Sequence, residues 1–351
     1  MFVRFLHPEI PPPTVAHRRP EPPWLMLAAL LFLLPPGLAR AAETNQAPVI
    51  FHVGLAQICF RDVNRIDARA AYKTFLESRG RLLGKTYVAD PEVFDDTPTF
   101  EAAIQHQPMH MAVMDAWQFL TMDIHQQMKP YFAIRENGKV GRNYVVLTRR
   151  DSGLDTLRSL RGRELLVLEV ASYNVGKTWL DTRLLTEGLE TQEMFFGGQK
   201  VVAKPTSAIL PVFFGKAAAC MVDGPSFAVM TELNPQVGER LQTVAVSDTF
   251  ADVVVCLSEN YWSCAKDKID TIQSMTDLGQ DPLGQQICTM FKIDGMVPFQ
   301  DSQLDTLRKL RASYESLRTG AARANPRLQP ALPPGTINPP PLGQSPQIQP
   351  D

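Results

Sequence analysis

The sequence lacks the short motifs that mark several common catalytic and metal-binding sites. It contains no Gly-x-Ser-x-Gly, no His-Glu-x-x-His and no Cys-x-x-Cys. These patterns carry a serine nucleophile, a zinc-bound water and a redox-active or metal-binding cysteine pair, respectively. We therefore expect a protein that catalyses no reaction and has no cofactor.

An excess of positive charge is also lacking. The 351 residues include 35 Lys and Arg against 37 Asp and Glu, for a formal net charge of −2. A nucleic-acid partner requires a basic face, so this balance argues against one. The 44% apolar and 21% charged residues are ordinary for a globular protein. The length suffices for two lobes, each with its own core.

Long apolar runs are absent, and the longest covers only residues 24–34. Such a run is too short to span a bilayer comfortably but suits the core of a signal peptide. Arg18 and Arg19 precede it, and Ala39-Arg40-Ala41 offers small residues for cleavage. We expect residues 1–41 to be a signal peptide and the mature protein to be periplasmic. An uncleaved anchor is the alternative.

Cysteines are few and odd in number, which leaves at least one thiol free in an oxidising compartment. The five are Cys59, Cys220, Cys256, Cys264 and Cys288. Cys220 and Cys256 lie in apolar, strand-like runs and are expected to be core residues. Cys264 with Cys288 is the preferred disulfide, although the sequence does not fix the pairing.

Strand and helix patterns alternate along most of the chain. The strand pattern of 49–55 leads into helical spacing over 66–83, and a second cycle begins near Asp151. This alternation predicts an α/β fold with mostly parallel sheets, and its restart predicts two lobes. The Pro-rich residues 321–351 are expected to form a disordered tail.

One motif has two interpretations. Residues 171–178 read Ala-Ser-Tyr-Asn-Val-Gly-Lys-Thr, a relaxed P-loop after an apolar strand, and 218–223 resemble a Walker B strand. An NTPase would use Lys177. A P-loop needs several glycines so that its backbone N–H groups can surround the phosphates, and this loop has only one. Alternatively, the N–H groups of a helix starting near Asn174 bind a small anion, or Ser172 merely caps that helix.

Two predicted strands end in an aspartate. Asp223 follows the apolar run 219–222, and Asp115 ends a similar strand two residues before Trp117. Ligands of open α/β sheets bind at the carboxyl ends of strands. Asp223 either accepts a hydrogen bond from a ligand amine or caps the next helix.

Methionine and histidine are concentrated between residues 106 and 128, and soft ligands in an exported protein suggest copper. The residues are His106, Met109, His110, Met111, Met114, Met122, His125 and Met128. Strand alternation places Met111 on the opposite face from His110, so most of these methionines are better explained as core. Periplasmic copper binding is kept as an alternative function.

Taken in order, these features resemble a known family. They include Gly54-Leu55, the strand ending at Asp115, the run 144–154, the Leu-x-x-Leu-Arg-Gly of 157–162, and Gly215 through Val222-Asp223. As an ordered set they resemble the phosphonate-binding periplasmic proteins of ABC transporters, within the type II periplasmic-binding-protein fold. The resemblance covers roughly residues 49–318.

The resemblance implies two lobes of mostly parallel sheet flanked by helices and joined by two crossing strands, near 143–149 and 244–256. Lobe one is then 49–142 with 257–318, and lobe two is 143–256. It also implies a phosphonate- or phosphate-like anion held between the lobes, for an ABC permease or a membrane sensor. We expect a monomer.

The ligand-binding residues follow from the same resemblance and from the loops after the strands. They are Phe60, Asp115, Trp117, Tyr144, Ser172, Tyr173, Asn174, Asp223 and Phe227. The family carries a Ser/Thr-rich run before the helix, where this chain has Ala171-Ser172-Tyr173-Asn174. This run offers fewer hydroxyl donors, which weakens the case for a doubly charged phosphonate as the ligand.

Overall fold

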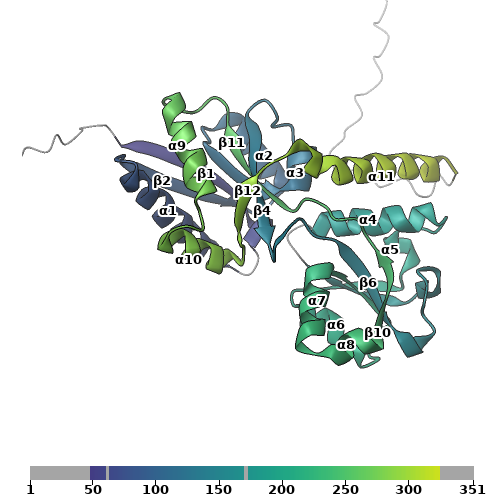
Figure 1. The fold of residues 1–351 in the computed structure, drawn as a ribbon. Coiled ribbons are helices and arrows are strands. Elements are labelled where there is room, and N and C mark those ends of the chain that lie inside the picture. The colour runs from purple at the N-terminus through teal and green to yellow at the C-terminus, as the bar shows by residue number, and fades with distance from the viewer. Residues whose placement is uncertain (1–47, 61–62, 170–172, 325–351) are drawn as a thin grey trace, which may run out of the picture. The chain divides into compact units, whose positions relative to one another are not determined.

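A computed structural model describes residues 48–60, 63–169 and 173–324, and it confirms the α/β fold class. The strands form two sheets (Figure 1). The first has the order β12-β4-β11-β3-β1-β2, with β5 paired to β4, and the second has the order β10-β6-β9-β7-β8.

The first sheet is parallel on one side and antiparallel on the other. Its strands are β1 (Val49–Ala56), β2 (Tyr87–Phe94), β3 (Met111–Asp115), β4 (Met128–Glu136), β5 (Lys139–Val140), β11 (Val253–Ser258) and β12 (Gly295–Pro298). β1 runs parallel to β2 and β3, whereas β11 is antiparallel to both β3 and β4.

The second sheet has the same mixed character. Its strands are β6 (Tyr144–Arg149), β7 (Glu164–Leu168), β8 (Gly198–Val202), β9 (Ala219–Asp223) and β10 (Leu241–Val246). β7 runs parallel to β8 and β9, and β6 runs antiparallel to β9 and β10. The expected mostly parallel sheets are therefore mixed. The chain enters the second sheet at β6 and returns to the first at β11. These two strands are not joined to their neighbours by a crossover helix, so they need not run parallel to them.

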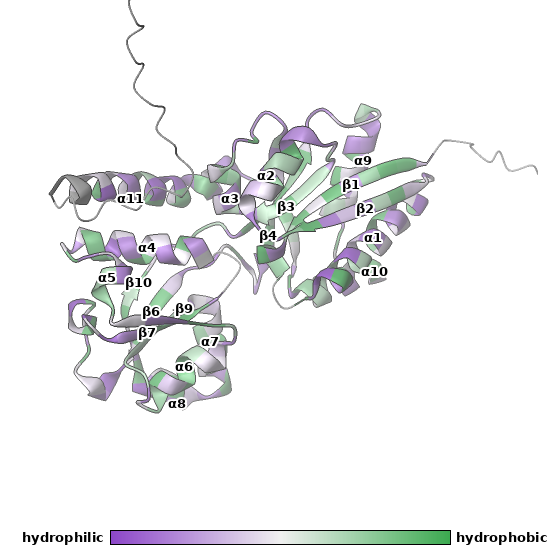
Figure 2. Cartoon of the chain, turned by 180° about the vertical axis from the view of Figure 1, so that it is seen from behind, coloured by the Kyte–Doolittle hydropathy of each residue, from purple (hydrophilic) through white to green (hydrophobic). Residues whose placement is uncertain are grey.

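Helices flank both sheets. They are α1 (Arg65–Leu82), α2 (Thr97–His106), α3 (Ala116–Thr121), α4 (Tyr173–Thr186), α5 (Gln192–Phe195), α6 (Pro205–Phe213), α7 (Gly224–Leu233), α8 (Pro235–Arg240), α9 (Ala265–Thr276), α10 (Pro282–Phe291) and α11 (Asp305–Ala324). In Figure 2 they carry hydrophilic and hydrophobic segments in alternation, as expected for helices with one buried face.

The first helix shows how the sequence sets these elements. Asn64 caps α1, because its side-chain oxygen accepts from the Asp67 N–H at 2.9 Å. Ala68, Tyr72 and Phe75 follow at spacings of four and three, and all three are buried. They pack with β1 residues in the hydrophobic core of the first sheet.

Two segments carry the chain between the sheets, and they are hydrogen-bonded to each other. Arg142 and Phe250 form an isolated antiparallel bridge with two N–H···O bonds of 2.9 Å. Gly141 has φ +85°, and a Cβ there would lie 2.2 Å from the Phe250 carbonyl oxygen. We call residues 141–143 and 247–252 the linkers. Glycine is required where they approach.

The cysteines do not pair as expected. Cys264 and Cys288 are both free thiols, so the preferred Cys264–Cys288 disulfide is wrong. Cys264 is exposed at the N-cap of α9, whereas Cys288 is half-buried on α10, and the distance between these helices cannot be predicted from the sequence. Cys220 and Cys256 are buried core residues of β9 and β11, as predicted, and burial raises the pKa of each thiol.

The expected signal peptide (1–41) and most of the expected tail (325–351) lie outside the described residues. Among the helices that are described, none combines the length and the apolar character needed to cross a membrane.

Candidate ligand-binding site

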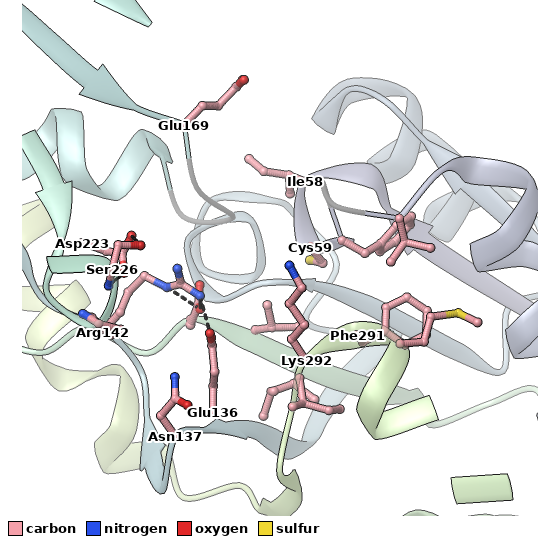
Figure 3. Close-up of a pocket in the computed structure, with 18 of the residues that line it drawn as sticks. Ile58, Cys59, Glu136, Asn137, Arg142, Glu169, Asp223, Ser226, Phe291 and Lys292 are labelled. Carbon is pink, nitrogen blue, oxygen red and sulfur yellow. Dashed lines mark hydrogen bonds and ion pairs between the residues drawn. The ribbon is translucent and has the colours of Figure 1, made fainter. Parts of the chain in front are cut away.

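A cavity of about 490 Å³ is lined by residues from elements of both sheets. Its lining includes the segment after β1, the β4–β5 hairpin, both linkers, the starts of α6 and α7, and the end of α10. The segments after β1, β7, β8 and β9 follow the carboxyl ends of parallel strands, where α/β sheets hold ligands. Figure 3 shows the labelled polar side chains of this cavity.

The Arg142 guanidinium lies in a cluster of carboxylates at one end of the cavity (Figure 3). Its Nε donates to Asp252 Oδ2 at 2.6 Å, and its Nη2 lies 3.0 Å from Glu136 Oε2. Burial opposes the charge of Arg142, but the carboxylates, Asp252 foremost, raise its pKa. Burial also raises the pKa of Glu136, although Arg142 counteracts part of this effect. Arg142 therefore serves first to neutralise buried acids.

Asp223 caps α7 at the cavity wall. Its carboxylate accepts from the Ser226 N–H at 2.9 Å and from the Ser226 hydroxyl at 2.7 Å, and only 2% of the residue is exposed. The next residue, Gly224, donates its N–H to the Asn143 carbonyl at 2.8 Å. Of the two roles expected for Asp223, the structure contains the cap, whereas contact with a ligand amine stays a prediction.

Lys292 supplies the second positive charge of the cavity lining. It ends α10 in the left-handed region, with φ +55°. Among the described non-glycine residues, only Lys292 and Asn137 have positive φ, and both line this cavity. Asn137 precedes Gly138 in the hairpin turn, where that conformation is usual. Lysine does not favour the left-handed conformation that Lys292 adopts, and strained residues of this kind cluster at functional sites.

The loop that carries Lys292 is fastened to the hairpin. The Gly138 N–H donates to Asp294 Oδ2 at 2.6 Å, and the Asp294 N–H donates to the Arg135 carbonyl at 2.8 Å. These two bonds place Asn137 and Lys292 on the same side of the cavity.

The start of α6 offers one backbone donor to the same space. Pro205 and Thr206 line the cavity, and Lys204 at the N-cap makes no side-chain capping bond. Pro205 has no N–H, and the Ser207 N–H donates to the Lys204 carbonyl at 2.9 Å, so the Thr206 N–H is the donor that this helix start offers, together with its partial positive charge. The cavity therefore combines one helix start, one lysine and several apolar side chains with a neutralised ion cluster.

The structure brings some of the expected ligand-binding residues to the cavity and leaves others elsewhere. Phe60 and Asp223 line it. Asp115 and Tyr144 are 1% and 2% exposed and are not among the lining residues; Tyr144 packs beside Trp179 instead.

Three further expected residues, Trp117, Asn174 and Phe227, are also not among the described lining residues. Trp117 and Phe227 lie against hydrophobic clusters, and Asn174 is exposed on α4. Ser172 and the side chain of Tyr173 lie outside what the structure describes. The role of each of these residues stays a prediction.

Sequence reasoning missed most of the charged residues of the cavity. They are Glu136, Arg142, Glu169, Asp252 and Lys292. The one available signal was the Asn137-Gly138 pair, which marks a tight hairpin and so the position of Glu136. No local pattern marks Lys292, because its place depends on where α10 ends.

The two alternative functions find little support in their own residues. Lys177 lies on α4 and is not among the residues lining the cavity, and Asp223, the expected Walker B acid, caps α7. The five methionines of the Met/His-rich stretch are all buried in hydrophobic clusters. Over the described ranges, no group of three or more His, Cys, Asp and Glu side chains is placed to hold a metal ion.

A family model described as "ABC transporter, phosphonate, periplasmic substrate-binding protein" matches residues 64–304. The match spans more than half of the chain, so the chain belongs to this family of substrate-binding proteins. The family resemblance seen in the sequence is thereby confirmed, and the family is periplasmic. Among curated protein sequences, none matches this chain.

Solved structures show the same fold at low sequence identity. XAC2383 from Xanthomonas citri, solved bound to ATP, is 13% identical with a TM-score of 0.58 over 77% of this chain and 98% of that one. PhnD1 from Prochlorococcus marinus, in complex with methylphosphonate, is 11% identical with a TM-score of 0.54 over 76% and 98%. A binding-protein component of an ABC phosphonate transporter from Pseudomonas aeruginosa is 11% identical, with a TM-score of 0.50 over 80% and 99%.

Proposed function

We propose that this chain captures a small organic oxyanion of low charge in the cavity and presents it, as a monomer, to an ABC permease or a membrane sensor. It catalyses no reaction. The observation that carries the proposal is Lys292, a cavity-lining cation held in an unfavourable backbone conformation. Family membership and the Thr206 N–H at the start of α6 support the same proposal.

The charges of the cavity limit the charge of the ligand. Four carboxylates (Glu136, Glu169, Asp223 and Asp252) line it against two cations, Arg142 and Lys292. Arg142 is already engaged by Asp252 and Glu136. A dianion would meet more repulsion than attraction here, so a monoanion such as a sulfonate or a singly ionised phosphonate fits better.

A thermal-shift screen of the purified protein tests the proposal. The panel is methylphosphonate, ethylphosphonate, ethanesulfonate, phosphate, acetate, glycine, ATP and Cu²⁺. A ligand at one hundred times its Kd adds about 2.7 kcal/mol, which corresponds to a shift of several degrees. We expect shifts with the sulfonate and the phosphonates. A shift with ATP or Cu²⁺ alone, or with nothing, contradicts the proposal.

The charge limit has its own test. A phosphonate takes on its second negative charge near neutral pH, as a phosphate ester does, whereas a sulfonate stays a monoanion. Ethylphosphonate affinity should therefore fall as pH rises from about 6 to 8, relative to ethanesulfonate. The sulfonate corrects for titration of the protein, including that of Glu136. Equal pH profiles for the two ligands contradict the limit.

The NTPase alternative is separated from binding by one variant. Lys177→Ala should leave oxyanion affinity nearly unchanged, because Lys177 is not among the cavity-lining residues. An NTPase that used Lys177 would lose ATP hydrolysis in the same variant. ATP hydrolysis by the purified wild type that disappears with this substitution would replace our proposal.

We also propose that the chain is exported through residues 1–41. The mature protein recovered from the periplasm should then begin near residue 42. N-terminal sequencing of that fraction distinguishes cleavage from retention of an uncleaved anchor.

A further inference from the structure

The cavity has an apolar wall beside its charged end. Phe291, the last residue of α10, lies directly before Lys292 in the chain. Its ring packs at 6.0 Å from that of Phe60 in an edge-on arrangement and at 5.3 Å from that of Tyr72. Phe60 and Tyr72 are only 6% and 8% exposed, so the wall is fixed by the core behind it.

Two apolar side chains at the cavity are left open to water. Met290 on α10 is 40% exposed, and Val229 on α7 is 47% exposed. No residue of α7 is buried, so the packing of that helix does not cover Val229. Apolar side chains that line a concave site gain free energy when a ligand covers them.

Charge and apolar surface therefore adjoin in one site. In Figure 3, Lys292 lies between the Arg142–Glu136 group and Phe291. A cavity of about 490 Å³ is also in the range that holds drug-sized ligands, and a one-carbon phosphonate leaves most of it to water.

We propose that the ligand of this cavity is an amphiphile: an oxyanion that carries a hydrocarbon or aryl group of several carbons. The oxyanion lies near Lys292, and the apolar group covers Phe291, Met290 and Val229. This inference rests on the proposed function and adds the chemical class of the ligand to it.

Calorimetric titration of the full purified chain with methyl-, propyl-, pentyl- and phenylphosphonate tests the inference. Burial of one methylene in an apolar site lowers Kd about fourfold, so pentylphosphonate should bind roughly two hundred times more tightly than methylphosphonate. Equal or decreasing affinity with chain length overturns the inference but leaves the proposed function standing. Binding of none of the four overturns both.

Variants locate the apolar contact. Met290→Ser should weaken pentylphosphonate about three- to tenfold and leave methylphosphonate unchanged, because only the longer chain reaches that side chain. Met194→Ser is the matched control, since Met194 is 60% exposed on α5 and is not a lining residue. The control should leave the whole series unchanged. Identical effects of the two variants overturn the inference.

A second reading of the apolar wall makes the opposite prediction. If Met290 and Val229 only meet each other when the protein closes on a small ion, a longer alkyl chain obstructs that contact. Affinity then falls from methyl- to pentylphosphonate. Val229→Thr, which keeps the side-chain shape and replaces a methyl group with a hydroxyl, would then weaken methylphosphonate as much as pentylphosphonate, whereas our inference predicts a loss with pentylphosphonate only.

Discussion

Strands β3 and β9, one in each sheet, end in the same way. Asp115 accepts from the Gln118 N–H at 2.7 Å to cap α3, and Asp223 accepts from the Ser226 N–H at 2.9 Å to cap α7. The partner is three residues on in both cases, the usual spacing of a helix N-cap.

Both junctions are also tied to the linkers. The residue after each aspartate donates its N–H to a linker carbonyl: Ala116 to Asp252 at 2.7 Å and Gly224 to Asn143 at 2.8 Å. Each sheet therefore fastens one helix start to one of the two segments that pass between the sheets.

The third residue of each helix makes the difference. Gln118 returns a side-chain contact to the Asp115 N–H and donates to Thr97, and this closes the β3 junction to water. Ser226 is short, and both it and Asp223 line the cavity. The same capping motif thus serves folding in one sheet and also forms part of the candidate site in the other.

The largest expected effect comes from Arg142, where the linkers meet. Arg142→Met leaves Asp252 and Glu136, both partly buried, without their cation, and should lower the free energy of unfolding by about 3–5 kcal/mol. Urea unfolding measures this loss. Arg161→Met is the control, because its pair with Glu190 is exposed and should cost about 1 kcal/mol or less. Equal losses would contradict the role assigned to Arg142.

The two capping aspartates should differ in their effect on stability. Asp115→Ala removes a fully buried cap and leaves the buried Gln118 side chain without its capping partner. The free energy of unfolding should fall by about 2–3 kcal/mol. Asp223 lines the cavity, so water can replace its carboxylate in Asp223→Ala. This variant should lower the free energy of unfolding by about 1 kcal/mol. Equal losses in urea unfolding would remove the distinction between the junctions.

Acid should weaken the first sheet more than the second. The residue directly before β3 is His110, which can take up a proton, whereas the residue directly before β9 is the half-buried Ala218, which cannot. Burial, and next the neighbouring His52, lowers the pKa of His110 from 6.5 to about 4. The unfolded chain therefore binds this proton first as pH falls below about 6.5, and stability drops by about 2 kcal/mol between pH 7 and pH 5.

His110→Asn should flatten this pH dependence, because asparagine does not titrate and keeps an acceptor for the His52 N–H. Urea unfolding at pH 7 and pH 5 provides the comparison. His125→Asn, at an exposed histidine, is the control and should leave the slope as it is in the wild type. A slope unchanged in the His110 variant would count against its buried, uncharged state.

The smallest expected effect is on affinity. Asp223→Asn keeps a capping oxygen and removes one negative charge from the cavity lining, so oxyanion affinity should rise roughly three- to tenfold. Asp115→Asn is the matched change at the closed junction and should leave affinity unchanged. Calorimetry with ethanesulfonate measures both. A rise in both variants, or in neither, would contradict the difference proposed between the two junctions.

The sequence was sufficient for features that depend on local pattern. The strand and helix alternation predicted the α/β class, and the breakers after Asp223 correctly placed it at the end of a strand. Phe60 was expected in the loop that follows β1, and it lines the cavity, while its contact with a ligand stays a prediction.

Features that depend on distant contacts could not be predicted in this way. Arg142 owes its role to Asp252, 110 residues away, and to the bridge between the linkers. Lys292 reaches the cavity because α10 ends where it does and Asp294 bonds to the hairpin. The mixed sheets follow from the same cause, since β11 pairs with strands that precede it by more than one hundred residues.

Lys292 is the charge that should receive the oxyanion. Calorimetric titration of ethanesulfonate into the wild type, Lys292→Met and the exposed control Lys216→Met tests this. We predict one binding site in the wild type, a loss of affinity of about tenfold or more in Lys292→Met, and no change in the control. Equal affinity in the wild type and Lys292→Met, or no binding to the wild type by this or any other oxyanion, would contradict the account.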